Sequence, residues 1–406
     1  MDRRTLLQRT GASLIASFAP WPAAAQSQRA PLRYLRTNWS RDPYSFGSYS
    51  YIAKNARRRD YRILGRPIED RIFFAGEATH PKRNSTVHAA YESGQRAADL
   101  VVDTSAERIA IIGAGASGLS AAYSLVEAGR DVTVFEARNR IGGRVWTDTS
   151  LGVPLDLGAS WIHGIRGNPL TKLADSLELD RVHTDDSYII RGRGGQAIRD
   201  RDAPDWLEQV TEVQHSAGAD LSQLNTWAYW NDSDYDGIDV VFPGGYAEMF
   251  TALNEASEIR LGTPITSVTL TDAGVTLGTA GARETDIFDA VIVTLPLGVL
   301  KQGSVSFSPP LLNDKQSAIQ RLGMGVLDKV YLQFSEVFWD EDTTWIATPE
   351  NDLPQGQFNQ WLNLAKYIGQ PVIMAFNGGT PALDLADLTD EAVIERALQT
   401  LNLAYP

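Results

Sequence analysis

The stretch RIAIIGAGASGL, residues 108–119, decides the fold of this chain. Its first five positions are mostly apolar, which is typical of a buried parallel strand. Three glycines follow in the order GxGxxG, ahead of a stretch with helical spacing. Gly113 permits a tight turn, Gly115 lets the backbone approach a pyrophosphate, and Gly118 lets the helix pack closely on the strand. This arrangement predicts a βαβ unit that binds a dinucleotide at the N-terminus of its helix.

An acidic residue and a second glycine pair support this interpretation. Glu136 ends the next predicted strand, about 20 residues after Gly115, where a carboxylate accepts hydrogen bonds from the ribose hydroxyls of FAD or NAD. Gly142, Gly143 and Arg144 then suit a second backbone approach and a charge clamp on a pyrophosphate. The alternatives are a glycine turn in some other βαβ unit and an ordinary turn that carries a surface arginine.

Length, charge and cysteine content narrow the function classes. A chain of 406 residues suggests two domains, or one large domain with an insertion. The formal charge of −13 argues against nucleic acid and anionic membranes as partners and favours cationic ligands, although solubility alone also explains it. The absence of cysteine excludes disulfides, thiolate metal sites and flavin attachment through cysteine. The five histidines show no metal-ligand spacing, so no metal site is predicted.

The N-terminal residues resemble a targeting segment. Residues 1–25 contain the pair Arg3 and Arg4, a moderately apolar stretch and a run of alanines suited to cleavage. The arginine pair favours the twin-arginine export route; the alternatives are an ordinary secretory signal and a basic helix start. We therefore expect a periplasmic or secreted protein without stable membrane association after export. Residues 1–25 are left out of the predicted fold.

The remaining pattern is that of an α/β protein with a second, mixed region. A strand over 72–75 and a helix over 85–102 stand directly before the glycine stretch, and residues 171–235 are mostly polar and predicted helical. Further strands are predicted up to residue 295 and across 328–334. A C-terminal helix over 389–403 begins near the N-cap residue Thr389.

Stretches spread over nearly the whole chain resemble the flavin amine oxidase family, which includes polyamine oxidases, monoamine oxidases and flavin histone demethylases. The polyamine oxidase branch is the most similar. The matching stretches are IAIIGAGASGLSAA (109–122), VFEARNRIGGRVWT (134–147), DLGASWIHG (156–164), FPGGY (242–246), VIVTLPLGVLK (291–301), FSPPLL (307–312), RLGMGVLDKVYLQF (321–334), WSRDPYSFGSYSY (39–51), IFFAGEATH (72–80) and STVHAAYESGQRAA (85–98).

The resemblance implies a non-covalently bound FAD. It assigns the glycine loop and Glu136 to the adenosine half, Arg144 to the pyrophosphate, Glu77 to the ribityl chain, and the backbone N–H groups of Thr86 and Val87 to the pyrimidine edge of the flavin. Read without the family, Glu77 is a capping acid and Thr86 an N-cap. Ser48 stands where covalent monoamine oxidases have cysteine. The other cofactor-binding residues are Gly76, Arg138, Gly142, Gly143, Gly158, Ala159 and the backbone near Ile265.

Three residues are implied for catalysis. Lys329 matches the family lysine that holds a water near flavin N5, and a lysine inside an apolar strand is costly unless it is paired or functional. Its alternative is a strand-end lysine that reaches solvent. Tyr49 matches an aromatic wall of the substrate site, whereas the facing wall position falls on Thr86. His163 matches a polar residue near the substrate, with a structural histidine as the alternative.

The implied reaction is the oxidation of a small-molecule amine by FAD and O2. A neutral amine gives a hydride to FAD, and the resulting imine hydrolyses to an aldehyde. Oxygen then reoxidises the flavin and is reduced to hydrogen peroxide. The acidic residues Asp232, Asp234, Asp236 and Asp239 could attract a polyamine, but a solvated acidic loop is favoured. The alternative functions are an L-amino-acid oxidase, which needs an arginine for the carboxylate, and a flavin-binding protein without turnover. An NAD dehydrogenase is disfavoured, because it has no use for the stretches around residues 144 and 77.

The order of the stretches departs from the family. Residues 39–80 resemble the stretches that close ordinary members, yet they precede the glycine loop here. We therefore expect a circularly permuted chain whose fold combines a Rossmann-like FAD-binding domain of the glutathione-reductase type with an α+β substrate domain. The expected FAD-binding domain covers 32–170 and 240–300, of which 32–103 is the permuted segment. The expected substrate domain covers 171–239 and 301–406.

Overall fold

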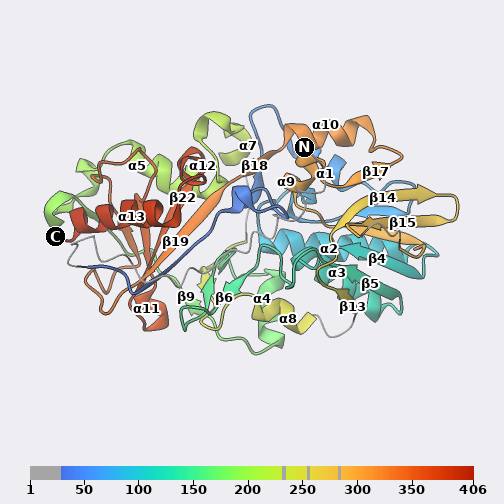
Figure 1. Ribbon diagram of the computed structural model, residues 1–406, viewed down its shortest axis with the longest axis horizontal. Coiled ribbons are helices and arrows are strands. Elements are labelled where there is room, and N and C mark those ends of the chain that lie inside the picture. The colour runs from blue at the N-terminus through green and yellow to red at the C-terminus, as the bar shows by residue number, and fades with distance from the viewer. Residues whose placement is uncertain (1–28, 231–234, 254–256, 282–284) are drawn as a thin grey trace.

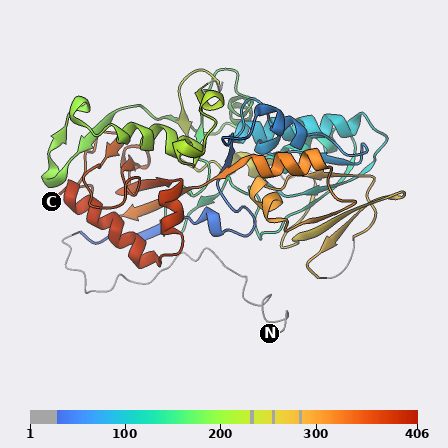
Figure 2. The same cartoon turned by 90° about the horizontal axis from the view of Figure 1, so that it is seen from above.

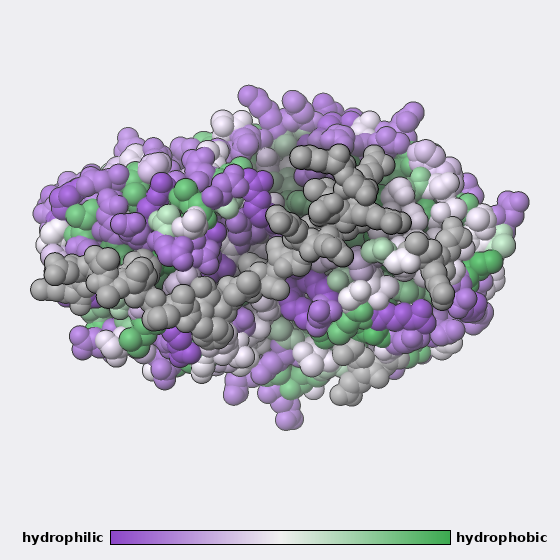
Figure 3. Space-filling model, in the orientation of Figure 1, coloured by the Kyte–Doolittle hydropathy of each residue, from purple (hydrophilic) through white to green (hydrophobic). Residues whose placement is uncertain are grey.

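The computed structural model describes residues 29–230, 235–253, 257–281 and 285–406. The molecule is elongated and has two lobes along its long axis (Figure 1). The predicted targeting segment 1–25, together with Asp232 and Asp234, lies outside the described residues. Within the described residues, no helix is long and apolar enough to cross a membrane. On the face shown in Figure 3, hydrophilic residues predominate and hydrophobic ones lie scattered between them.

The first lobe is built on a five-stranded, fully parallel sheet. The glycine stretch forms its β4 strand as predicted, and successive residues of this strand point to opposite faces. Ile109 and Ile111 join the core cluster under the helices, while Ala110 and Ile112 join the cluster on the other face. The strand order is β13 (Glu258–Arg260), β5 (Asp131–Phe135), β4 (Arg108–Ile112), β16 (Ala290–Val293) and β3 (Ile72–Phe74).

Two long helices cover one face of this sheet and a small sheet covers the other. Helix α2 (Val87–Val102) packs on α3 (Ala116–Glu127) at very close range, since a Cβ on Gly94 would lie 2.1 Å from the Ser117 carbonyl oxygen. The hairpin sheet on the opposite face contains β15 (Gly274–Thr279), β14 (Ile265–Thr271) and β17 (Ser306–Ser308).

The second lobe is built on a seven-stranded, mainly antiparallel sheet. Its outer face packs against α13 (Asp390–Ala404), which begins at the predicted N-cap Thr389. Figure 2 shows the blue strand β1 in the same lobe as the red helix α13. The strand order is β1 (Arg33–Arg36), β19 (Leu327–Gln333), β22 (Val372–Gly378), β21 (Gln360–Asn363), β20 (Trp345–Ala347), β10 (Tyr188–Arg191) and β11 (Ala197–Ile198).

The structure corrects two of the expected domain boundaries and one expectation about secondary structure. Strand β1 pairs with β19, so residues 33–36 belong to the seven-stranded sheet and not to the first lobe, to which they were assigned. Conversely, α10 (Asn313–Arg321) packs on α1 (Arg58–Leu64) in the first lobe. The buried ammonium of Lys315 fixes this contact, because it donates to the carbonyl oxygens of Ile63 and Leu64 at 3.0 and 2.7 Å.

The third correction concerns residues 171–235, which were expected to be mainly helical. They also supply strands β10 and β11, which complete the edge of the seven-stranded sheet because the apolar pair at 189–190 pairs with β20.

Other short strands form two small sheets and a hairpin. These are β8 (Trp161–Ile162), β12 (Val240–Val241) and β9 (Val182–His183); β18 (Gly323–Gly325) and β2 (Tyr49–Tyr51); and β6 (Thr147–Asp148) and β7 (Leu155–Asp156).

The remaining helices are short and connect or cover these sheets. A π-helical segment, η5 (Gln209–Gln214), continues directly into α6 beside the second lobe. The short helices are α4 (Pro169–Ser176), α5 (Trp206–Glu208), α6 (His215–Ala217), α7 (Thr226–Trp230), α8 (Glu248–Thr251), α9 (Leu297–Gln302), α11 (Ala365–Ile368) and α12 (Thr380–Leu385).

Candidate active site

The glycine loop adopts a geometry that leaves room for a phosphate. Gly113 has φ +105°, a conformation that L side chains rarely adopt. A Cβ on Gly115 would have no neighbour closer than 3.9 Å, so this position opens toward the cavity. A Cβ on Gly118 would lie 1.9 Å from the Gly113 carbonyl oxygen, which confines that glycine to helix packing. Gly142 joins the loop by donating its N–H to the Ala114 carbonyl oxygen at 2.8 Å.

Glu136 lies where a ribose-binding acid is expected. Its carboxylate is buried and accepts hydrogen bonds from the backbone N–H groups of Ala114 and Arg138, both at 2.8 Å. Each oxygen keeps a further lone pair for a ribose hydroxyl. The guanidinium of Arg138 forms a bidentate ion pair with Asp42 at 2.9 and 2.6 Å, which fixes the early segment against this end of the cavity.

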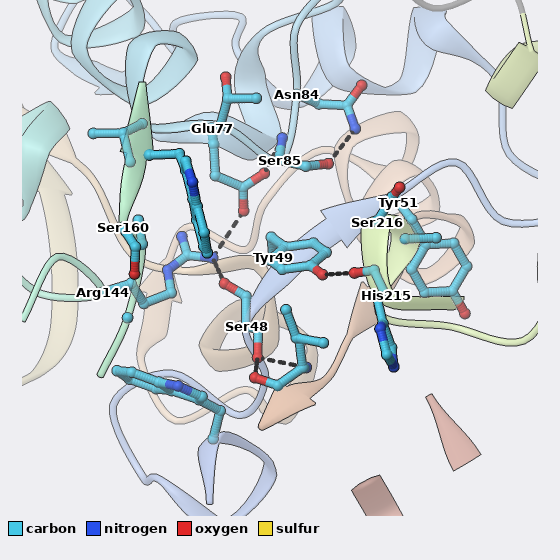
Figure 4. A pocket seen from close by; sticks show the side chains of 18 of the residues that line it. Ser48, Tyr49, Tyr51, Glu77, Asn84, Ser85, Arg144, Ser160, His215 and Ser216 are labelled. Carbon is cyan, nitrogen blue, oxygen red and sulfur yellow. Dashed lines mark hydrogen bonds and ion pairs between the residues drawn. The ribbon is translucent and has the colours of Figure 1, made fainter. Parts of the chain in front are cut away.

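Glu77 is the centre of a buried polar network at the turn after β3. Its carboxylate accepts hydrogen bonds from Ser50 Oγ at 2.6 Å, from the Ser85 N–H at 3.0 Å and from Arg144 Nη1 at 2.9 Å. Arg144 also donates to the Ser48 carbonyl oxygen at 2.9 Å. Figure 4 shows this network beside Tyr49. Both Glu77 and Arg144 line the cavity, so a bound cofactor would meet an ion pair here.

Lys329 lies on the inner face of β19 and does not reach solvent. Its Nζ atom donates to the carbonyl oxygens of Asp156 and Gly158 at 2.7 and 2.6 Å, and to Ser160 Oγ at 2.6 Å. Burial lowers the pKa of Lys329 to about 7, while the carboxylate of Asp156 acts in the opposite direction. The strand-end alternative is therefore wrong: this lysine is a buried amine on the cavity wall.

Aromatic rings surround Lys329. Its ammonium lies 5.7 Å from the ring centroid of Trp161 and 5.9 Å from that of Phe376. Trp161 stacks on Trp345 at 6.1 Å. Tyr49 is partly buried on another wall, where its hydroxyl donates to the His215 carbonyl oxygen (Figure 4), and desolvation raises its pKa, so it stays neutral. The rings of Trp161, Trp345 and Phe376 form an apolar wall next to the amine of Lys329.

His163 stands farther along the same wall. Its ring stacks on Trp161 at 6.2 Å, and its Nδ1 atom lies 2.6 Å from a carboxylate oxygen of Asp239. Half of its side chain is exposed, so the ring is accessible from the cavity, while its contacts with Trp161 and Asp239 also suit the alternative of a structural histidine. Asp236, another residue of the predicted acidic loop, does not line the cavity, whereas Asp239 does.

One cavity of about 1690 Å³ unites these features. This exceeds the usual range of about 300–1,000 Å³ for a single small-molecule site, so there is room for a dinucleotide and a substrate together. Every predicted site residue lines it except Gly118. The lining residues are Gly113, Gly115, Glu136, Arg138, Gly142, Gly143, Arg144, Gly158, Ala159, Ile265, Gly76, Glu77, Thr86, Val87, Tyr49, His163 and Lys329.

The sequence did not single out several residues of the cavity. Trp161 and Phe376 lie beside Lys329, and Gln360 and His215 face each other at 2.6 Å on the substrate side. The sequence marks Gln360 only as a polar residue at the start of the strand QWLN (360–363). Within the described residues, no group of histidine and carboxylate side chains could hold a metal ion.

The parallel sheet, the phosphate-compatible glycine loop, the buried ribose acid and the buried lysine define a flavin-dependent oxidoreductase with a separate substrate lobe. A family model described as "Flavin containing amine oxidoreductase" matches residues 2–102, 116–215 and 183–406. Polyamine oxidase 2 of Arabidopsis thaliana is 30% identical over 376 residues, covering 78% of this chain and 75% of the relative. The chain belongs to the flavin-containing amine oxidase family.

Other relatives and solved structures agree with this assignment. Probable polyamine oxidase 4 of Arabidopsis thaliana is 30% identical and covers 73% of this chain and 71% of the relative. Cyclohexylamine oxidase from Brevibacterium oxydans has the same fold, with a TM-score of 0.59, 22% identity and coverage of 74% of this chain and 81% of that structure. The protein is therefore an FAD-dependent amine oxidoreductase.

Proposed function

We propose that the protein oxidises a linear polyamine to an imine that hydrolyses to an aldehyde, with release of hydrogen peroxide. The observation that carries this proposal is the charge of the substrate side of the cavity, which residues 184–239 and 327–376 line. Among the described residues of these two ranges, the cavity has Lys329 as its only lysine or arginine. The carboxylates there are Asp186, Asp200, Asp205, Glu208, Glu212 and Asp239. A cavity lined by one sign of charge concentrates ligands of the opposite sign, here an amine with several ammonium groups.

The chain's own residues orient the amine and control its protonation. Bound FAD supplies the acceptor for the two electrons and the hydrogen of the amine carbon. Burial lowers the pKa of Lys329, so its ammonium gives up a proton more readily than that of a solvent-exposed lysine. The neutral amine has a lone pair that can accept a hydrogen bond from a water. The rings of Tyr49, Trp161 and Phe376 exclude bulk water and align the carbon chain.

The arginines of the cavity argue against an L-amino-acid oxidase. Recognition of an amino-acid carboxylate needs a free guanidinium. Arg138 and Arg144 are engaged by the carboxylates of Asp42 and Glu77. The third cavity arginine, Arg83, lies outside the ranges 184–239 and 327–376 that line the substrate side. We therefore favour a polyamine over an amino acid.

The circular permutation and the export route are also part of this proposal. The hydrogen bond of 2.5 Å from Arg29 Nη1 to the Tyr405 carbonyl oxygen supports the permutation, because the two segments that ordinary members join lie together in space. A rearranged chain that starts at residue 107 and carries 29–106 after residue 406 should bind FAD equally well. A reporter fused behind residues 1–28 should reach the periplasm only when Arg3 and Arg4 are both present.

An anaerobic absorbance spectrum of the purified protein tests the proposed function. Spermidine, spermine, a monoalkylamine and an L-amino acid are added in turn. We expect the flavin bands to bleach fastest with a polyamine and to return when oxygen is admitted, with formation of hydrogen peroxide. The proposal is contradicted if only the amino acid bleaches the flavin, or if none of the added amines does.

A further inference from the structure

A single row of side chains crosses the inner face of the seven-stranded sheet. Lys329 on β19 lies opposite Phe376 on β22, which lies opposite Gln360 on β21. Gln360 lies opposite Ala347 on β20, which lies opposite Ile190 on β10. All five residues line the cavity. The row therefore offers a straight path across the strands, away from the lysine.

The spacing of this row fits an extended chain molecule. Neighbouring strands lie about 4.8 Å apart, so Gln360 stands about 10 Å from Lys329 along the row. Phe376 fills the place between the two polar residues, and its side chain is 5% exposed. Beyond Gln360 the row continues with Ala347 and Ile190, which are again apolar. This alternation of polar and apolar residues matches a linear polyamine, in which nitrogen atoms are separated by methylene groups.

Gln360 is held in one orientation by His215. The His215 Nδ1 atom lies 2.6 Å from Gln360 Oε1, and because this oxygen only accepts, Nδ1 carries the proton. The imidazole also packs against Phe376, with ring centroids 5.8 Å apart. Burial lowers the pKa of His215 to about 4, so the ring is neutral and does not repel a cation. One lone pair of Gln360 Oε1 remains available to a ligand.

We propose that Gln360 is a specificity-determining residue that accepts a hydrogen bond from a second nitrogen of an elongated amine lying across the strands over Phe376. His215 is a positioning residue that fixes the amide for this contact. The inference rests on the proposed function and deepens it: the substrate class is a linear amine whose second nitrogen is separated from the reacting one by an alkyl segment. The carboxylates on α5 and η5 then receive ammonium groups farther along the chain.

Matched substrates and variants test the contact. The substrates are octylamine, 1,8-diaminooctane and spermidine, followed by anaerobic flavin bleaching and by steady-state turnover. Gln360→Leu should raise KM for the diamine and spermidine by about tenfold or more, leave KM for octylamine within about twofold, and leave kcat nearly unchanged. Gln360→Glu should lower KM for both polyvalent amines. Gln302→Leu, at the exposed end of α9, is the matched control and should alter neither value.

His215→Phe tests the positioning role, because it keeps a ring against Phe376 and removes the Nδ1 donor. It should raise KM selectively for the diamine, and its effect should not add to that of Gln360→Leu in the double variant. Equal effects on octylamine and the diamine, or full additivity, overturn the inference. Failure of every amine to bleach the wild-type flavin would instead overturn the proposed function, so the two failures are distinguishable.

Discussion

The carboxylate of Glu77 accepts a hydrogen bond from the guanidinium of Arg144 over 2.9 Å, inside the cavity and largely shielded from water. The two residues come from different segments: Glu77 follows β3, and Arg144 follows the second glycine pair. Their pairing brings the end of the parallel sheet against the loop that approaches the phosphate. An ion pair in such a position is costly to desolvate and needs further hydrogen bonds, which Ser50 and Ser85 supply.

Replacing Glu77 with glutamine should weaken FAD binding. All neighbours of Glu77 in the network donate hydrogen bonds, so the NH2 group of the introduced amide would face a donor. Arg144 would also lose its charge partner, because the amide is neutral. We expect the dissociation constant of FAD to rise by about tenfold or more, measured by fluorescence as FAD is added to the apoprotein. Glu127→Gln on the exposed side of α3 is the control, and equal FAD affinity in the two variants would contradict this role.

Two glycines of the loop should separate cofactor binding from folding. Gly115→Ala adds a methyl group that meets no protein atom closer than 3.9 Å, so the apoprotein should melt at the wild-type temperature. That methyl group occupies the space through which a pyrophosphate would approach, so FAD affinity should fall by about tenfold or more. Gly118→Ala places its methyl group 1.9 Å from a carbonyl oxygen and should lower the melting temperature itself. The comparison uses far-ultraviolet circular dichroism and FAD titration. A destabilised Gly115→Ala apoprotein would argue against the open position of this glycine.

Much of the first lobe could be predicted from the sequence because its signals are local. The glycine spacing and the apolar run before it each depend on residues a few positions apart. The same holds for Thr389, which begins α13 in the second lobe. Strands β10 and β11 were missed, since apolar runs of three residues (188–190) and two residues (197–198) in a polar region carry little periodicity. Strand β20, the partner that joins β10 to the sheet, lies about 150 positions away in the sequence, at Trp345–Ala347.

The cofactor side of the cavity was predicted more completely than the substrate side. Gly113, Glu136 and Arg144 belong to stretches with their own spacing. In contrast, His215 and Gln360 are 145 positions apart and meet only through packing of η5 and α6 on the seven-stranded sheet. No local pattern records such a contact.

The buried Asp328 gives a prediction about pH and stability. Burial raises the pKa of its carboxyl to about 6, although Trp39 N–H and Thr37 Oγ1 both donate to it, at 2.9 and 2.8 Å. The value in an unfolded chain is about 3.9, so between about pH 4 and 6 the folded protein binds more protons at this group. The contribution of this group to the free energy of unfolding therefore decreases as the pH rises through that window.

Asp328→Asn should remove this decrease in the free energy of unfolding at high pH. The asparagine Oδ1 can still accept both hydrogen bonds, and no charge is buried. At about pH 7.5 the variant should be more stable than the wild type by about 1–2 kcal/mol, and near pH 4 the two should be alike. Thermal unfolding at both pH values checks this, with the exposed Asp99→Asn as control. A gain of equal size at both pH values would mean that the carboxyl charge is not its cause.

The chain has two buried lysines, Lys329 and Lys315, and comparing them tests whether a lysine amine takes part in proton transfer during the reaction. Burial lowers the pKa of both to about 7, but only Lys329 lines the cavity. If Lys329 exchanges a proton during amine oxidation, flavin reduction should accelerate as the pH rises through about 7, where its amine becomes neutral. Lys329→Met should reduce the rate constant by about 10²–10⁴ and abolish this inflection.

Lys315→Met should leave the inflection unchanged, because its ammonium faces the end of α1 and the ring of Phe74. The variant should instead lower the melting temperature, since three carbonyl oxygens lose a donor. Stopped-flow flavin bleaching between about pH 6 and 9 measures the profile in each variant. An inflection that persists in Lys329→Met would assign the titration to another group, such as the substrate amine itself, and would remove Lys329 from the proton-transfer step.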